Sequence, residues 1–328
     1  MGATFPYGFG MIENVPFGRG GIGMSQLVFG GSVIGGLFRP VSDDEAQDAL
    51  AAAWDGGIRA FDTAPHYGVG QSESRIGRFF ADKPRDEYVL STKVGRLLVD
   101  TDEDVEGVDE FYGTPRRKRV RDYSRDGVLR SLESSLERLQ VDRIDIIYIH
   151  DPEDYMDQAI GEACPALSEL RDQGVIRSFG AGMNLTAPLE RFARETDADT
   201  LMLAGRYSLL DMCAAESLLP ACEQRGVSVI AAGVFNSGIL ANPVPGAHYE
   251  YAPASEELIA RAVRVRDVCE RHGVSVRAAA MAFVLRHPAV QAVAVGARSR
   301  EQIEGNIAEF GANIPDALWA ELEAIPSA

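Results

Sequence analysis

Eight short runs of apolar, strand-forming residues, spread along the whole chain, constrain the fold of this sequence more than any other feature. Longer stretches with helical spacing, or loops, separate one run from the next. Alternation of this kind is typical of parallel sheets whose strands are joined by helical crossovers. The predicted strands are 26–32, 58–64, 88–94, 143–150, 176–183, 200–206, 227–233 and 290–296.

Helical patterns fill several of the intervals. Residues 42–54 begin with Ser-Asp-Asp-Glu, a capping-box pattern. Residues 125–140 place apolar side chains at 128, 129, 132, 136 and 139, which is helical spacing. Glycines at Gly57, Gly174 and Gly226 supply the left-handed turn that ends a helix before the next strand. The other predicted helices are 164–173, 214–225 and 300–310.

Eight strand–helix units imply a closed parallel barrel or a large doubly wound sheet, and the count of eight favours the barrel. A doubly wound dinucleotide-binding sheet would place G-x-G-x-x-G between its first strand and helix, whereas residues 29–36 read FGGSVIGG. We therefore predict an α/β protein, a (β/α)8 TIM barrel that forms a single domain over residues 1–328. Long loops follow strand three (95–124) and strand seven (234–254), and residues 1–24 are expected to form a hairpin at the bottom of the barrel.

Composition and charge narrow the class of partner. A net charge of −17 would repel nucleic acid and anionic lipid. The sequence shows no signal peptide and no 18-residue apolar run, so we expect a soluble cytoplasmic protein with no membrane partner. Four cysteines fit no zinc template, and we predict buried reduced thiols and no metal site. These are Cys164, Cys213, Cys222 and Cys269.

Four polar residues lie at or just after the ends of predicted strands two, three and four: Asp62, Tyr67, Lys93 and His150. The carboxyl ends of neighbouring barrel strands meet at the rim where barrel enzymes carry their sites, so these side chains should converge. A lysine ammonium beside a phenol favours the phenolate and lowers its pKa. Asp62 would hold Lys93, and His150 could orient a substrate oxygen or relay a proton. Hydride must come from or go to a nicotinamide, because no side chain carries one.

The run GIRAFDTAPHYG at 57–68 resembles the first signature of the aldo-keto reductase family, and the contexts of Lys93 and His150 match its other catalytic segments. The resemblance extends from about Gln26 into the C-terminal region. It implies a catalytic tetrad of Asp62, Tyr67, Lys93 and His150, with Tyr67 transferring the proton. It also implies NAD or NADP as the cofactor and a small molecule as the substrate.

The family binds its dinucleotide extended across the barrel mouth. The resemblance implies that Asn184 contacts the nicotinamide carboxamide and that Ser237 and Gly238 cover the pyrophosphate. It implies an adenosine site at Gly296, Arg298, Gln302 and Asn306.

Three departures from the family pattern affect this site. Ala204 stands where a glutamine is common on strand six. Ala232 or Gly233 stands where an aromatic ring often stacks on the nicotinamide, and Phe235 could replace that ring. Gln302 stands where an arginine often binds the 2′-phosphate, which favours NAD over NADP. Arg298 and Arg300 could still contact such a phosphate, so both cofactors stay open.

Three segments resemble the aldose 1-dehydrogenase branch of the family, which includes the L-fucose, D-threo-aldose and L-galactose dehydrogenases. They are 204–210 (AGRYSLL), 38–42 (FRPVS) and 150–154 (HDPED). The resemblance implies oxidation of a cyclic hemiacetal to its lactone. Pyridoxal 4-dehydrogenase activity and general carbonyl reduction are alternatives within the family.

Two other classes of function stay open. Lys93 could form a Schiff base in an aldolase, which would require a depressed pKa and no aspartate partner. A sensor or regulatory subunit would bind dinucleotide without turnover.

Two smaller features also have more than one interpretation. The basic cluster 116–121 could bind an anionic substrate or pair with the acidic residues at 100–104, and His66 could be structural or contact the edge of the substrate.

Overall fold

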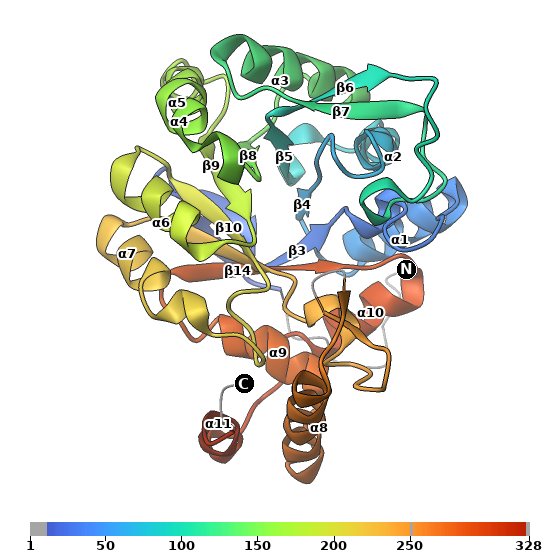
Figure 1. The fold of residues 1–328 in the computed structure, drawn as a ribbon, viewed down its shortest axis with the longest axis vertical. Helices are drawn as coiled ribbons and strands as arrows, with labels where there is room; N and C mark the ends of the chain where they lie inside the picture. The colour runs from blue at the N-terminus through green and yellow to red at the C-terminus, as the bar shows by residue number, and fades with distance from the viewer. Residues whose placement is uncertain (1–11, 250–251, 326–328) are drawn as a thin grey trace, which may run out of the picture.

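The computed structural model describes residues 12–249 and 252–325 and contains a closed barrel of eight parallel strands. Around the barrel the strands follow chain order, and each pairs with the next in parallel register (Figure 1). The (β/α)8 prediction and all eight predicted strands are confirmed, although most strands are shorter than predicted. The strands are β3 (Leu27–Gly30), β4 (Ala60–Asp62), β5 (Val89–Val94), β8 (Ile146–His150), β9 (Ser178–Met183), β10 (Thr200–Ala204), β11 (Ser228–Ala232) and β14 (Val290–Gly296).

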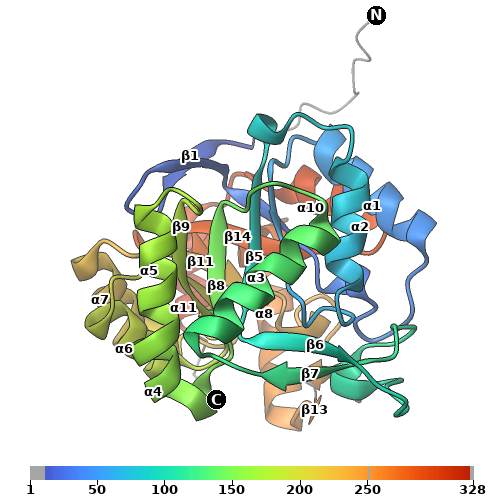
Figure 2. The same ribbon diagram turned by 90° about the horizontal axis from the view of Figure 1, so that it is seen from above.

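Helices surround the barrel (Figures 1 and 2). The predicted capping box is present: the Ser42 side chain accepts from the Glu45 amide, and the Glu45 carboxylate accepts from the Ser42 amide. The five predicted helices correspond to α1 (Asp43–Asp55), α3 (Arg125–Leu139), α5 (Cys164–Asp172), α7 (Leu218–Arg225) and α10 (Arg300–Glu309). In the described part of the chain six further helices were not predicted: α2 (Gln71–Phe80), the three-residue α4 (Met156–Gln158), α6 (Thr186–Glu195), α8 (Glu256–Arg271), α9 (Val276–Val284) and α11 (Asp316–Glu323).

An antiparallel hairpin, β1 (Asn14–Phe17) and β2 (Ile22–Ser25), closes the amino-terminal end of the barrel. Phe17, Ile22 and Met24 are buried among barrel-interior side chains such as Tyr148. The Gly18 amide donates to the Ser228 hydroxyl at the start of β11, 3.1 Å away. The predicted hairpin is thus confirmed for residues 12–24, and residues 1–11 lie outside the described part. Because this end is filled, the opposite end is the one available for a site.

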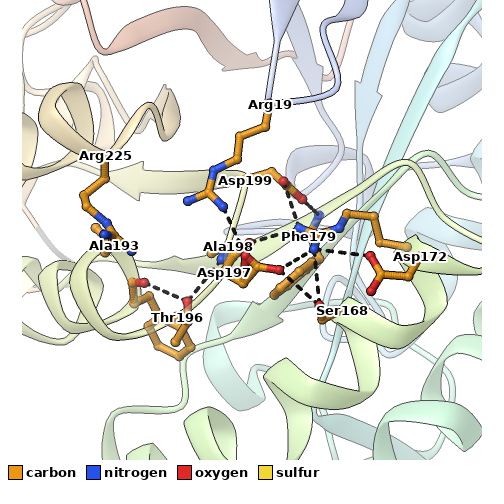
Figure 3. Close-up of polar contacts among 12 residues, drawn as sticks. Arg19, Ser168, Asp172, Phe179, Ala193, Thr196, Asp197, Ala198, Asp199 and Arg225 are labelled. Carbon is orange, nitrogen blue, oxygen red and sulfur yellow. Dashed lines mark hydrogen bonds and ion pairs between the residues drawn. The ribbon is translucent and has the colours of Figure 1, made fainter.

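Charged side chains attach the hairpin to the barrel wall (Figure 3). Arg19, in the hairpin turn, lies 3.0 Å from Asp197. Arg171 of α5 contacts Asp197 and donates to buried Asp199 at 2.9 Å. Asp199 also accepts from the Phe179 amide in β9, 3.1 Å away. Ion pairs thus join the hairpin turn and α5 to the segment before β10, and a hydrogen bond links that segment to β9, at the end of the barrel away from the site.

The loop after β5 is more ordered than the sequence indicated. Its ends form an antiparallel hairpin of β6 (Arg96–Asp100) and β7 (Arg117–Arg121). Arg117 pairs with Asp100 at 3.1 Å, and Lys118 pairs with Glu103 at 3.0 Å, so the acidic and basic halves do pair. Two later arginines of β7 reach the carboxyl end of the barrel. Arg119 donates to the His66 carbonyl, and Arg121 lines the cavity there.

The loop after β11 contains a short 3-10 turn (Asn236–Gly238) and a pair of two-residue strands, β12 (His248–Tyr249) and β13 (Ala252–Pro253). Cys164, Cys222 and Cys269 are buried as predicted, but Cys213 is exposed. That prediction was wrong because Cys213 begins a surface 3-10 turn rather than lying within α7. Within the described ranges, we find no helix that combines the length and apolarity needed to cross a bilayer.

Candidate active site

The four polar residues predicted to converge all line one cavity of about 710 Å³ at the carboxyl end of the barrel. Asp62, Lys93 and His150 lie at or near the ends of β4, β5 and β8, which are consecutive barrel strands. Tyr67 lies in the loop after β4. That loop passes so close to Gly35 that a Cβ there would lie 2.8 Å from the Tyr67 carbonyl carbon, so a glycine is needed to seat it.

Lys93 is the buried centre of this group. Its ammonium donates to Asp62 Oδ2 at 2.6 Å and to the Thr63 carbonyl at 2.9 Å. The ammonium also lies over the Tyr67 ring, 4.6 Å from the ring centroid. Ser91 donates to the other Asp62 oxygen at 2.7 Å. Two hydrogen bonds and the ring contact therefore fix Lys93 between the Asp62 carboxylate and Tyr67.

The electrostatics of this pair agree only in part with the sequence prediction. Burial alone would lower the pKa of Lys93, but Asp62 and Tyr67 outweigh it and raise that pKa, so the ammonium stays charged. Burial raises the pKa of Tyr67 to about 12 although Lys93 acts in the opposite direction. Lys93 therefore lowers the pKa of Tyr67, as predicted. The net pKa is nevertheless raised, because the loss of hydration is the larger effect.

His150 is a neutral imidazole next to Tyr67. The two rings are 5.8 Å apart and nearly perpendicular. Burial and the charges of Arg96 and Lys93 hold the pKa of His150 well below its usual value. Its Nε2 lies 3.5 Å from Asp151 Oδ2, and its Nδ1 is buried with no hydrogen-bond partner in the described ranges. Tyr123 fixes the backbone here by donating to the His150 carbonyl at 2.6 Å.

Arg96 and Asp151 are among the further charged residues that line the cavity, and neither was assigned a role from the sequence. Arg96, the first residue of β6, donates to Asp151 Oδ2 at 2.6 Å and to His66 Nδ1 at 3.1 Å. Asp151 has a left-handed backbone (φ 43°), which is uncommon outside glycine and places its carboxylate beside Arg96. Asp151 could have been found as the neighbour of His150. Arg96 could not, because its place depends on the β6–β7 hairpin.

The cavity continues past the four residues to the ends of β10, β11 and β14. Three small residues, Ala204, Ala232 and Ala294, line it there together with Met202. Four of the seven residues predicted to bind dinucleotide line this part: Asn184, Ser237, Gly238 and Gly296.

The other three predicted contacts do not line the cavity. The Gln302 side chain accepts from the Arg298 amide at 3.1 Å, and Asn306 is buried within α10. The sequence analysis did not single out Asn236, which does line the cavity and whose Oδ1 is buried without a partner in the described ranges. Space for a ring, an unsatisfied amide oxygen and a glycine-rich rim fit a bound dinucleotide.

Comparison with known proteins identifies the class. Residues 26–326 match the Aldo/keto reductase family, so the chain belongs to that family and is an NAD(P)-dependent oxidoreductase acting on CH–OH groups. The chain is 44% identical to a D-threo-aldose 1-dehydrogenase of a Pseudomonas species over 315 residues, which cover 92% of this chain and 94% of the relative. It is 40% identical to a pyridoxal 4-dehydrogenase of Microbacterium luteolum, with 95% and 97% covered.

A solved structure supports the fold. An aldo-keto reductase of Bacillus halodurans in its holo form superposes with a TM-score of 0.78 at 23% identity, covering 96% of both chains. At that identity the likeness concerns the fold alone.

Proposed function

We propose that this protein oxidises the cyclic hemiacetal of an aldose, such as L-fucose or another D-threo-aldose, to its lactone, with NAD as the favoured cofactor and Tyr67 as the acid–base residue. One observation carries the proposal: the Lys93 ammonium lies 2.6 Å from Asp62 and 4.6 Å from the centroid of the Tyr67 ring, in a cavity that His150 also lines. The relative with 44% identity is named for this substrate class.

The reaction removes a proton and a hydride from the sugar. The anomeric hydroxyl gives its proton to the Tyr67 oxygen, and the electron pair of the broken O–H bond forms the second C1–O bond. The C1–H bond breaks at the same time, and its hydrogen leaves with both bonding electrons as hydride. A bound oxidised nicotinamide would supply the hydride acceptor, and the positive charge of its ring would favour the phenolate form of Tyr67. Lys93 stabilises the phenolate before proton transfer, Asp62 keeps Lys93 charged, and His150 orients the hydroxyl. The C1–O bond becomes the carbonyl of the lactone.

Contacts in α10 support NAD over NADP. Arg300 lies 2.7 Å from Asp48 and 3.3 Å from Glu304, so its guanidinium is already engaged by two carboxylates. Gln302 is neutral and accepts from the Arg298 amide. Of positions 298, 300 and 302, Arg298 alone then offers a cation for a 2′-phosphate, and a bidentate clamp with a second arginine is not available at these three positions.

Pyridoxal 4-dehydrogenase is the second candidate, because a relative with that name is 40% identical over nearly the whole chain. Phe111, buried and stacked 6.2 Å from the Tyr67 ring, offers an aromatic wall that suits a planar substrate. General carbonyl reduction would use the same residues in reverse. The aldolase alternative conflicts with the structure, because Lys93 has an aspartate partner and a raised pKa.

Following reduced-nicotinamide absorbance with L-fucose, D-arabinose, L-galactose and pyridoxal, each with NAD+ and with NADP+, tests these candidates. We expect turnover of at least one aldose, with NAD+ preferred. Turnover of pyridoxal alone would support the second candidate. Tight dinucleotide binding without turnover would support a sensor, and a borohydride-trapped adduct on Lys93 would support an aldolase.

A further inference from the structure

His66 lines the cavity directly beside Tyr67 and has no part in the reaction described above. Its ring centroid lies 5.4 Å from the His150 ring and 6.1 Å from the Tyr67 ring. Phe111 packs edge-on against it at 5.2 Å. A third polar ring thus borders the place where a substrate must lie to reach Tyr67 and His150.

Arg96 determines which nitrogen of His66 carries the proton. The Arg96 guanidinium lies 3.1 Å from His66 Nδ1. An arginine offers only donors and stays charged, so Nδ1 must be the acceptor and the neutral ring carries its hydrogen on Nε2. Arg96 is itself buried and held by Asp151 at 2.6 Å. The orientation and tautomer of His66 are therefore fixed by a cation that cannot turn away.

The surroundings of His66 keep it neutral. Burial and the charges of Arg96, Arg119 and Lys93, with a smaller effect of Arg121, hold its pKa well below the usual value. The facing carboxylate, Asp109, lies 3.9 Å from Nδ1 and is itself paired with Arg119 at 3.2 Å. At neutral pH the ring is therefore a hydrogen-bond donor through Nε2 and carries no charge.

We propose that His66 is a second substrate-binding residue, which donates its Nε2 hydrogen to the hydroxyl on the carbon next to the reacting carbon of the sugar. This inference rests on the proposed aldose oxidation. His66 Nε2 has no hydrogen-bond partner in the described ranges and is not among the atoms sealed from solvent there, so it opens into the cavity. A donor on His66 next to an acceptor on ionised Tyr67 matches the two vicinal hydroxyls that a sugar ring presents.

Sugars that lack only this hydroxyl test the assignment. We would measure kcat/KM with saturating NAD+ for D-arabinose against 2-deoxy-D-ribose and for L-fucose against 2-deoxy-L-fucose. The wild type should prefer the 2-hydroxy sugar by about tenfold or more, since a site built to bond a hydroxyl rejects the analogue without it. His66→Phe keeps a planar ring against Phe111 but has no donor, so the preference should fall to within about twofold. His66→Gln, whose amide can donate from a similar position, should restore part of it.

His287→Phe is the matched control, because His287 packs against Tyr207 at 6.1 Å and does not line the cavity. It should leave the preference unchanged, and the two His66 variants should bind NADH like the wild type. Aldose turnover with the same preference in the wild type and in His66→Phe would overturn the His66 assignment alone. No turnover of any aldose by the wild type would overturn the proposed function and this assignment with it.

Discussion

Replacing Lys93 by methionine tests the electrostatic basis of the proposed reaction. The ammonium lies 4.6 Å from the centroid of the Tyr67 ring. With an effective dielectric constant of about 20, Coulomb's law gives an attraction of about 3.6 kcal/mol between that cation and a phenolate. Losing it would raise the pKa of Tyr67 and, at about 1.4 kcal/mol per factor of ten, reduce the phenolate several hundred-fold at fixed pH. We therefore expect kcat/KM for aldose oxidation to fall by about 100- to 1000-fold.

The rate of oxidation should depend on pH in a direction that follows from the pKa of Tyr67. Burial raises the pKa of Tyr67 to about 12, so the phenol is protonated at neutral pH and the oxidation must wait for the phenolate. The rate of oxidation should therefore increase with pH, by about tenfold per unit until the pKa of the dinucleotide complex is reached. Initial rates with L-fucose and saturating NAD+, measured from roughly pH 6 to 10, would show this rise. In Lys93→Met the rise should continue to higher pH.

Two variants control for other effects of the substitution. Lys93→Met leaves Asp62 buried without its cation, so the double variant Asp62→Asn/Lys93→Met removes both charges and should lose a similar amount of rate. Lys83→Met removes a lysine that lies 5.3 Å from the Phe79 ring and outside the cavity lining, and it should be fully active. A Lys93→Met protein that binds NADH normally and oxidises aldose within about tenfold of wild type at neutral pH would refute the reasoning.

Three further predictions concern other parts of the molecule. Tyr67→Phe should reduce turnover by about 100- to 10,000-fold while NADH affinity, measured by fluorescence titration, stays near the wild-type value. Gln302→Arg adds a guanidinium at the expected adenosine site, so the ratio of kcat/KM for NADP+ to that for NAD+ should increase, and an unchanged ratio would place the 2′-oxygen elsewhere. Asp199→Asn removes a buried carboxylate that accepts from the Phe179 amide and Arg171, so urea unfolding should show a loss of about 2 kcal/mol or more, with unchanged kcat because the residue lies at the other end of the barrel.

The parts of the fold that follow from local pattern could be predicted from the sequence. The barrel strands are short and buried, so their apolar runs are visible, and the β-to-helix alternation fixes the class. Helix α9 was missed because its residues are apolar and mostly buried, so no periodic contrast marks it. The β6–β7 hairpin was missed because its pairing joins residues about twenty positions apart, and register at that range depends on tertiary contacts.

Some residues of the candidate site could likewise be predicted from the sequence, and others could not. Asp62, Tyr67, Lys93 and His150 could be placed together because strand ends of a barrel share one rim. The contact of Arg96 with His66 and Asp151 could not be anticipated, because it requires the hairpin to fold back over the rim. The high pKa of Tyr67 was not predicted either, because the sequence shows which charges are near the phenol but not how completely the phenol is removed from water.

The pairing of the rim arginines also bears on which substrate the cavity admits. Arg96 lies 2.6 Å from Asp151, Arg119 3.2 Å from Asp109, and Arg121 2.9 Å from Asp154. A carboxylate or phosphate on the substrate would have to displace one of these acidic partners to gain a cation, and it would leave that partner unpaired. A neutral sugar can hydrogen-bond to the same groups without breaking any pair. The β6–β7 hairpin therefore contributes fixed polar groups with balanced charge, which favours an uncharged hemiacetal over a sugar acid or a sugar phosphate.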